Sequence, residues 1–169
     1  LTGHMANAAE AAMAEVNASG KAKNNYISVR GDDTCTDAAA ATAATERAVT
    51  AEGVKGIIGG DCSGVTRAML TNVAMPNGIV MVSPSATSPA LTADPDNGLF
   101  FRTAPSDARE GEVMADILVE KGVKSIALTY SNSDYGKGLA ESIAIAFTAK
   151  GGVVTINAAH DDGKADYSA

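Results

Sequence analysis

Short apolar runs alternate with longer amphipathic or alanine-rich stretches along the whole chain. Runs bounded by Gly, Pro, Asp or Asn predict buried strands, and stretches with apolar residues at helical spacing predict helices. The strands are expected at residues 25–29, 54–60, 78–82, 100–103, 125–130 and 153–158. The helices are expected at residues 5–18, 38–51, 65–75, 106–121 and 133–150, with the first turn of another at 166–168.

Strand and helix therefore alternate, with roughly 22–29 residues from one strand to the next, which is the βαβ pattern of a doubly wound parallel sheet. The pattern is interrupted between residues 83 and 105 by a long connection that holds Pro84, Pro89, Pro95 and Pro105. Long proline-bearing connections mark domain boundaries. We predict a first lobe at residues 1–92, a crossover between lobes at 93–105 and the start of a second lobe at 106–169.

The stretch at residues 38–51 is rich in alanine, and low-complexity disorder is the alternative to a helix there. Thr36 or Asp37 can cap its beginning and Gly53 can end it. These flanking signals favour the helix.

Composition narrows the classes of partner. The chain has 169 residues, a formal net charge of −7 and no tryptophan. An acidic chain that is poor in aromatic residues is not expected to bind nucleic acid or anionic membrane surfaces. No apolar run approaches the roughly 18–20 residues that span a bilayer. The opening residues are typical of the interior of a longer protein, so a missing leader peptide says nothing about export.

Two cysteines, Cys35 and Cys62, leave three interpretations open: free thiols, a metal half-site or one disulfide. They lack CxxC spacing, and His4 and His160 are distant in sequence, so we predict no metal site. If the cysteines are paired, they close a loop of about 28 residues, for which the chain-entropy model gives roughly 3.5 kcal/mol of stabilisation.

The most informative stretch is residues 78–92, where a buried strand runs into hydroxyl side chains. Ser83, Ser85, Thr87 and Ser88 follow the strand, interleaved with two prolines. Open α/β sheets bind ligands just beyond the carboxyl ends of their strands. Hydroxyl, N–H and C=O groups together suit a small polar zwitterion, and we interpret this loop as half of a ligand clamp.

The neighbouring strand, at residues 56–60, leads to Ser63 at a helix start. The free N–H groups and dipole of a helix N-terminus can bind a carboxylate or a phosphate. The glycines match neither GxGxxG nor a P-loop, which argues against a nucleotide site. The simpler alternative is that Ser63 is only a helix cap.

Catalysis by a nucleophilic serine requires a base and an orienting acid. The chain has only two histidines, His4 and His160, and it has no GxSxG elbow. We therefore predict no catalytic residues and no enzymatic activity.

Five runs of residues resemble the extracellular ligand-binding receptors of branched-chain amino-acid ABC transporters, the leucine/isoleucine/valine-binding protein family. They occur in the family's order and spacing between about residue 24 and residue 169. The runs are Asp32-Asp33-Thr34-Cys35, Gly59-Gly60-Asp61-Cys62-Ser63, Val82-Ser83-Pro84-Ser85-Ala86-Thr87-Ser88-Pro89-Ala90-Leu91-Thr92, Phe101-Arg102-Thr103-Ala104-Pro105-Ser106-Asp107 and Tyr135-Gly136-Lys137-Gly138-Leu139-Ala140.

The resemblance implies an α/β protein of the type I periplasmic-binding fold, with doubly wound parallel sheets in two lobes that close on an amino acid. It also implies that the first lobe lacks its first strand here, that the second lobe is incomplete, and that Cys35 and Cys62 form a disulfide. In the clamp, Ser63 matches the serine that hydrogen-bonds the ligand carboxylate. Ser85 matches a position whose carbonyl takes the ammonium, Thr87 matches a threonine that serves both ends, and Ala86 lies between them.

Three further positions are carried over with alternatives. Tyr135 matches a tyrosine of the second lobe that covers the ligand side chain, and the alternative is a packing residue at a helix start. Asp107 matches an acidic residue near the lobe interface, and the alternative is a helix cap. Asp61 departs from the family, because leucine-type receptors carry an apolar residue there. Its carboxylate can favour a polar or cationic ligand side chain, or it can turn to solvent or cap a helix.

The sequence therefore predicts a periplasmic or extracytoplasmic solute-binding protein for a branched-chain or related polar amino acid or amide. The predicted partners are the amino-acid ligand and a membrane permease, with no nucleic acid and no cofactor, and the protein is expected to be a monomer. The second hypothesis is a ligand-sensing domain of the same fold, and the third is an enzyme.

Overall fold

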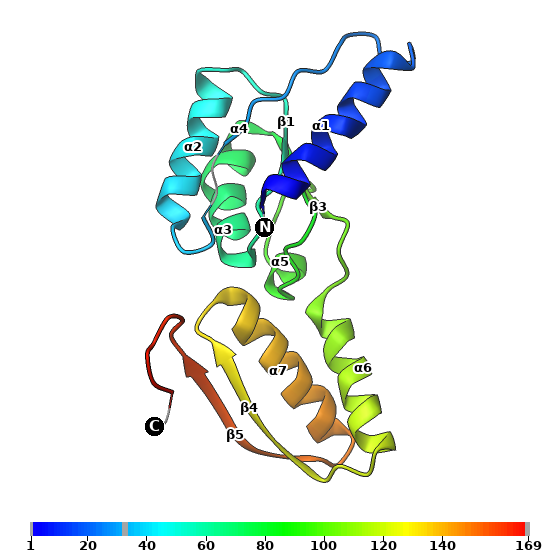
Figure 1. Cartoon of the computed structure of the whole chain (residues 1–169), viewed down its shortest axis with the longest axis vertical. Coiled ribbons are helices and arrows are strands. Elements are labelled where there is room, and N and C mark those ends of the chain that lie inside the picture. Colours follow the sequence, from blue (N-terminus) through cyan, green and yellow to red (C-terminus); the bar gives the residue numbers. More distant parts are fainter. Residues whose placement is uncertain (1, 32–33, 168–169) are drawn as a thin grey trace. The chain divides into compact units, whose positions relative to one another are not determined.

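Three of the described helices begin next to a side chain that caps them. A computed structural model describes residues 2–31 and 34–167. Asp37, Ser106 and Ser133 each accept a hydrogen bond from a backbone N–H in the first turn of the helix that follows. The helical segments are α1 (Thr2–Ala18), α2 (Ala38–Thr50), α3 (Ser63–Met69), the π-helical η1 (Leu70–Ala74), α4 (Met75–Asn77), α5 (Ala90–Ala93), α6 (Asp107–Glu120) and α7 (Asp134–Ala149) (Figure 1).

The strands are parallel and lie in two sheets. They are β1 (Gly56–Ile58), β2 (Val80–Ser83), β3 (Phe100–Arg102), β4 (Ser125–Ser131) and β5 (Val153–His160). The first sheet has the order β1-β2-β3 and the second pairs β4 with β5. Parallel strands joined through helices are what the βαβ pattern predicted.

The chain forms two compact units. Unit 1 contains Leu1–Asp61, Val65–Ser85 and Asp96–Thr103, and unit 2 contains Cys62–Gly64, Ala86–Pro95 and Ala104–Ala169. The first two residues of α3 thus belong to unit 2, and the rest of this helix belongs to unit 1. The predicted division into lobes at residues 92 and 106 stays a prediction.

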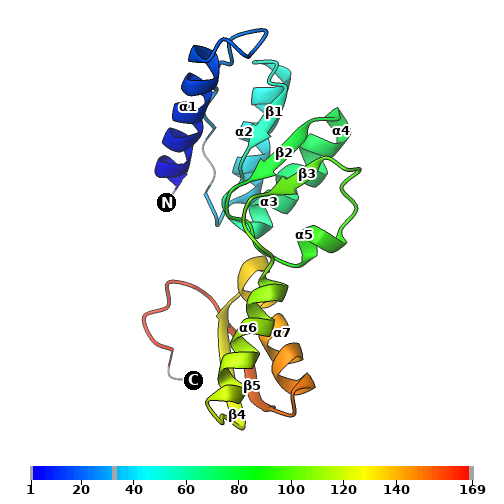
Figure 2. The same cartoon turned by 90° about the vertical axis from the view of Figure 1, so that its right-hand side faces the viewer.

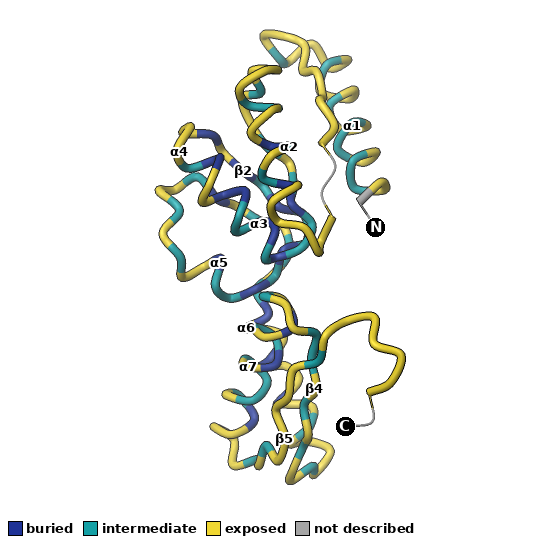
Figure 3. Tube along the Cα trace, turned by 90° about the vertical axis from the view of Figure 1, so that its left-hand side faces the viewer, coloured by how far each residue is buried: buried dark blue, intermediate teal, exposed yellow. Residues whose placement is uncertain are grey.

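Unit 1 is built around β2, the middle strand of its sheet (Figure 2). Ile57 of β1 aligns with Met81 of β2, and Met81 aligns with Phe100 of β3. Met81 has no exposed surface, and η1 packs against both β2 and α2. Figure 3 shows how burial concentrates in this region, while the outer surface of α1 and the segment after it are exposed. The core of unit 1 therefore lies where the helices cover β2.

The prediction of a strand at residues 25–29 is wrong. The segment has no regular secondary structure, and Ile27 is 87% exposed. Within the described part of the chain, β1 is hydrogen-bonded to β2 alone, so residues 25–29 do not extend the sheet. Instead, the backbone of Tyr26 is held against α1 by the amide of Asn17, at 2.8 and 2.9 Å. An apolar, β-branched sequence forms a strand only where a neighbouring edge is within reach.

In unit 2, α6 and α7 pack closely against each other, and α7 lies against the pair β4–β5. A Cβ atom on Gly111 of α6 would lie 2.6 Å from the backbone of Ser142 in α7, so only glycine permits this approach. Phe147 of α7 is completely buried, and its ring lies against Gly152 just before β5. These contacts form a small core that is separate from that of unit 1.

Several element boundaries differ from the prediction. The helix expected at residues 65–75 begins at Ser63 and runs to Asn77 through a π-helical segment. The proline-bearing connection contains the short helix α5, which was not predicted. Residues 166 and 167 are not helical, and Ser168 lies outside the described residues.

Cys35 and Cys62 are disulfide-bonded, as the resemblance implied. Asp32 and Asp33 lie outside the described residues. Among the helices that the structure describes, no stretch combines the length and the apolar character needed to cross a bilayer.

Candidate ligand-binding site

The ends of β1 and β2 are joined by serine hydroxyls in unit 1. The hydroxyl of Ser83, the last residue of β2, donates to the carbonyl of Gly60 at 2.7 Å. The hydroxyl of Ser85 donates both to the carboxylate Oδ1 of Asp61 at 2.6 Å and to its carbonyl at 2.9 Å. Since adjacent parallel strands end side by side, short polar side chains beyond them can bridge the two loops. Asp61 and Ser85 are therefore neighbours, and both are half-buried.

A second pair of serines lies in unit 2. The backbone N–H of Ser88 donates to the Oγ of Ser63 at 3.1 Å, and each residue is only 1% exposed. A serine oxygen that accepts from a fixed N–H still has its own proton to donate. Within the described chain this proton has no acceptor, so Ser63 offers a donor at the start of α3.

Thr87 lies between these serines in sequence and makes a different set of contacts. Its carbonyl accepts the backbone N–H of Asp107 at 3.0 Å, which ties the loop to the start of α6. Its hydroxyl has no hydrogen-bond partner among the residues that the structure describes, and the residue is half-buried. Ala86, just before it, is 1% exposed. The loop is therefore fixed through its backbone, while the hydroxyl of Thr87 is left for another group.

Asp107 and Tyr135 occupy the starts of α6 and α7. Asp107 is 1% exposed, whereas Tyr135 is 47% exposed. Partial burial raises the pKa of the Tyr135 phenol above its ordinary value, and the negative charges of Asp107 and Glu110 raise this pKa further. The phenol of Tyr135 is therefore protonated at neutral pH and can donate a hydrogen bond.

The start of α3 also lies beside the start of α7. A Cβ atom on Gly64 would lie 3.7 Å from the Cβ and Cγ atoms of Asp134, which is ordinary van der Waals contact. Two helix starts and the loop that carries Thr87 thus belong to the same unit.

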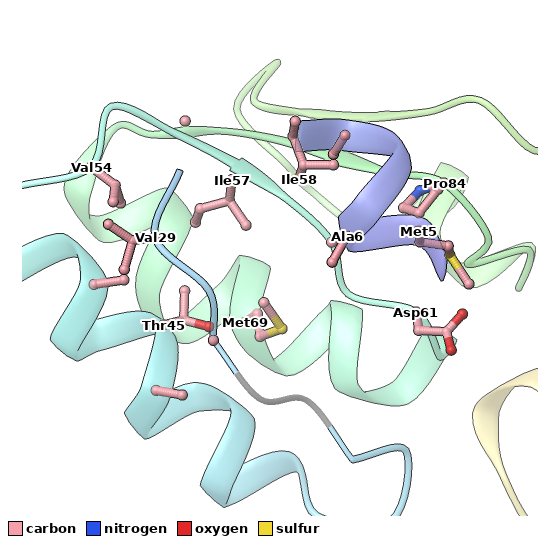
Figure 4. A pocket seen from close by; sticks show the side chains of 16 residues that line it. Met5, Ala6, Val29, Thr45, Val54, Ile57, Ile58, Asp61, Met69 and Pro84 are labelled. Carbon is pink, nitrogen blue, oxygen red and sulfur yellow. The ribbon is translucent and has the colours of Figure 1, made fainter. Parts of the chain in front are cut away.

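A cavity of about 190 Å³ lies in unit 1, beside β1 (Figure 4). Most of its lining is apolar: Met5 of α1, Ile57 of β1, Met69 of α3 and Val29, together with small residues of α1, α2 and β1. Among the predicted site residues only Asp61 lines it, at one end. An apolar space of this kind suits hydrocarbon and not the ammonium or carboxylate of a zwitterion.

The predicted residues thus fall into two groups. Asp61 and Ser85 belong to unit 1, and Ser63, Ala86, Thr87, Asp107 and Tyr135 belong to unit 2. Two features were not predicted from the sequence: the hydrogen bond from the N–H of Ser88 to Ser63, and the close approach of Gly138 to the loop. The repeated glycines of the YGKG run were the available signal for Gly138.

Parallel α/β units with hydroxyl-rich loops at the strand ends define the chain as a ligand-binding α/β protein. Comparison with known proteins gives the family. The model of the receptor family ligand binding region matches residues 4–169, and the chain belongs to this family.

Individual relatives agree with this assignment. The Leu/Ile/Val-binding protein of Citrobacter freundii is 38% identical over 137 residues, which is 80% of this chain and 36% of the relative. The Leu/Ile/Val/Thr-binding protein of Salmonella typhimurium is 35% identical over 147 residues, which is 86% of this chain and 39% of the relative. The chain therefore spans well under half the length of the curated relatives it matches.

A solved structure supports the fold. The branched-chain amino acid transporter substrate binding protein of Streptococcus pneumoniae, in complex with isoleucine, has a TM-score of 0.75 and 29% identity. The match covers 93% of this chain and 44% of that one. These comparisons confirm the resemblance to the branched-chain amino-acid receptors and the type I periplasmic-binding fold.

Proposed function

We propose that the protein binds a free α-amino acid through the loop that follows β2. The observation that carries this proposal is the hydroxyl of Thr87, which is half-buried and has no hydrogen-bond partner among the described residues. A hydroxyl that no protein group engages is open to a ligand, and a polar ligand group that pairs with it gains affinity. Serine hydroxyls on either side already have partners, which makes Thr87 the residue of this loop most suited to a ligand.

The two ends of the zwitterion are proposed to meet different groups. The hydroxyl of Ser63 donates a hydrogen bond to the ligand carboxylate. The Oγ of Ser63 already accepts the N–H of Ser88, which supports this role as a donor. The carbonyl of Ser85 accepts from the ammonium, because no described residue donates to it and its hydroxyl is engaged with Asp61. Thr87 contacts both the ammonium and the carboxylate, and Ala86 lies between Ser85 and Thr87. Hydrogen bonds to charged groups are among the stronger ones in proteins.

The ligand side chain is proposed to lie against Tyr135, whose half-exposed ring can cover an apolar group. Asp107 is proposed to contribute negative charge near the ammonium, since its charge already raises the pKa of Tyr135. The names of the two relatives described above give leucine, isoleucine and valine as ligands, and one of the names adds threonine. We propose the same class of aliphatic or small polar amino acids for this protein.

At the level of the whole protein, we propose a periplasmic substrate-binding protein of an ABC transporter, monomeric and without catalytic activity or cofactor. Its lobes, predicted at residues 1–92 and from 106 onward, would close on the ligand by a hinge motion and deliver it to a membrane permease. The relatives' names and the disulfide, which is typical of oxidising compartments, support this proposal.

The test is calorimetric titration of the full-length protein with L-leucine, L-isoleucine, L-valine and L-threonine. Thr87→Ala should weaken binding of every ligand that the wild type accepts by roughly 1–3 kcal/mol, because polar ligand groups lose their partner. Thr50→Ala, the same substitution at an exposed position of α2, is the control and should leave affinity unchanged. Equal affinities for wild type and Thr87→Ala would remove Thr87 from the site, and turnover of a ligand would refute the absence of catalysis.

A further inference from the structure

Gly138, in the second turn of α7, lies against the turn formed by Ser88 and Pro89. A Cβ atom on Gly138 would lie 2.9 Å from the Cδ of Pro89 and 3.0 Å from the Oγ of Ser88. Both distances are shorter than ordinary contacts between heavy atoms. The backbone of Gly138 does not have a positive φ, so the helix conformation itself does not demand glycine here. The close approach is therefore the reason for a glycine at this position.

The turn that touches Gly138 also sets the position of Ser63. Ser88 donates its N–H to the Oγ of Ser63 at 3.1 Å, and both residues are almost completely buried. The Oγ of Ser88 accepts the N–H of Ala90, which fixes the turn internally. A displacement of the turn away from α7 would lengthen the bond to Ser63 and move Thr87, the residue before Ser88.

We propose that Gly138 is a positioning residue of the amino-acid site. By having no side chain, it lets the Ser88–Pro89 turn reach the place where Ser88 orients the hydroxyl of Ser63 and where the hydroxyl of Thr87 faces the ligand. Gly138 touches no ligand itself. This inference rests on the function proposed above, since it concerns the geometry of the same site.

A second glycine of unit 2 provides a matched control. Gly111 of α6 also permits a close approach, but its Cβ would meet Ser142 of α7 and no part of the Ser88–Pro89 turn. Gly111→Ala should therefore lower thermal stability through overpacking of two helices. It should leave the affinity for ligand unchanged.

The experiment is calorimetric titration of the full-length protein and its variants with L-leucine, L-isoleucine, L-valine and L-threonine. Gly138→Ala should raise the Kd at least about fivefold, because the added methyl pushes against Pro89 and Ser88. Pro89→Ala removes the Cδ atom that lies nearest, so the double variant Gly138→Ala/Pro89→Ala should bind within about threefold of Pro89→Ala alone. A loss due only to altered helix stability would not be rescued by a change at Pro89.

The outcomes separate this inference from the proposed function. If the wild type binds none of the four amino acids, the proposed function fails and the inference fails with it. If the wild type binds but Gly138→Ala binds equally well, only the inference is overturned. Should Gly138→Ala not fold, the double variant decides: affinity near that of Pro89→Ala supports the positioning role, and a large loss contradicts it.

Discussion

The pairs Asp61–Ser85 and Ser63–Ser88 both join a strand-end loop to the loop after β2, but they differ in charge and exposure. Ser63 and Ser88 are neutral and almost fully buried, and they are linked through a backbone N–H. Asp61 and Ser85 are half-buried and are linked through a carboxylate. A buried backbone-linked pair tolerates little variation, whereas a partly exposed side-chain pair can change with the ligand. We infer that the Ser63–Ser88 pair and the carbonyl of Ser85 hold what all α-amino acids share, and that the carboxylate of Asp61 influences which side chain is accepted.

The largest effect is expected from Ser63→Ala. The substitution removes the proposed donor to the ligand carboxylate and leaves the buried N–H of Ser88 without its acceptor, so affinity for every amino acid should fall by roughly 1–3 kcal/mol. Titration with each of the four amino acids measures the loss. A change confined to one ligand would contradict the assignment of this pair to the shared part of the amino acid.

A smaller and selective effect is expected at Asp61. Asp61→Leu introduces the apolar residue that the resemblance implies for leucine-type receptors, and it should improve binding of L-leucine relative to L-threonine by about fivefold. Asp61→Asn keeps an acceptor for the hydroxyl of Ser85 and removes the charge, so it separates the hydrogen bond from the electrostatic contribution. Equal effects of Asp61→Leu on all ligands would show that the carboxylate of Asp61 has no role in selection.

Sequence reasoning succeeded where the interaction is local or lies in the strand-and-helix pattern. The cap at Asp37, one of the two candidates at the start of α2, could be predicted because it depends on the neighbouring N–H groups alone. The prediction of a strand at residues 25–29 was wrong because pairing depends on a distant edge. The glycines of the YGKG run indicate that some group approaches Gly138 closely, but they do not show that this group is Pro89, which lies far away along the chain.

The same distinction applies within the candidate site. The hydroxyl-rich loop was visible in the sequence, but which hydroxyls are engaged was not. Only the fold shows that Ser85 is bonded to Asp61 while the hydroxyl of Thr87 is available. The role of each residue depends on how close the ends of two strands lie, and no single segment of the sequence encodes that spacing.

The smallest effect is expected from Tyr135→Phe. The raised pKa of Tyr135 means that the folded state disfavours the phenolate. This contribution to stability is present below the ordinary tyrosine pKa of about 10 and is lost as pH rises through the raised pKa. Tyr135→Phe should therefore reduce the alkaline loss of stability slightly, as measured by thermal unfolding between about pH 8 and pH 11. An unchanged pH profile would argue that Tyr135 is as solvated in the folded protein as in the unfolded chain.

The central claim is that this site holds the ammonium and the carboxylate of a free amino acid. The most direct measurement compares L-leucine with its methyl ester and with 4-methylpentanoic acid, which lacks the amino group, by calorimetric titration of the full-length protein. The account predicts that each analogue loses at least about a hundredfold in affinity, because a charged group that is missing or masked leaves its partners unpaired. Binding of either analogue with the affinity of L-leucine would contradict it.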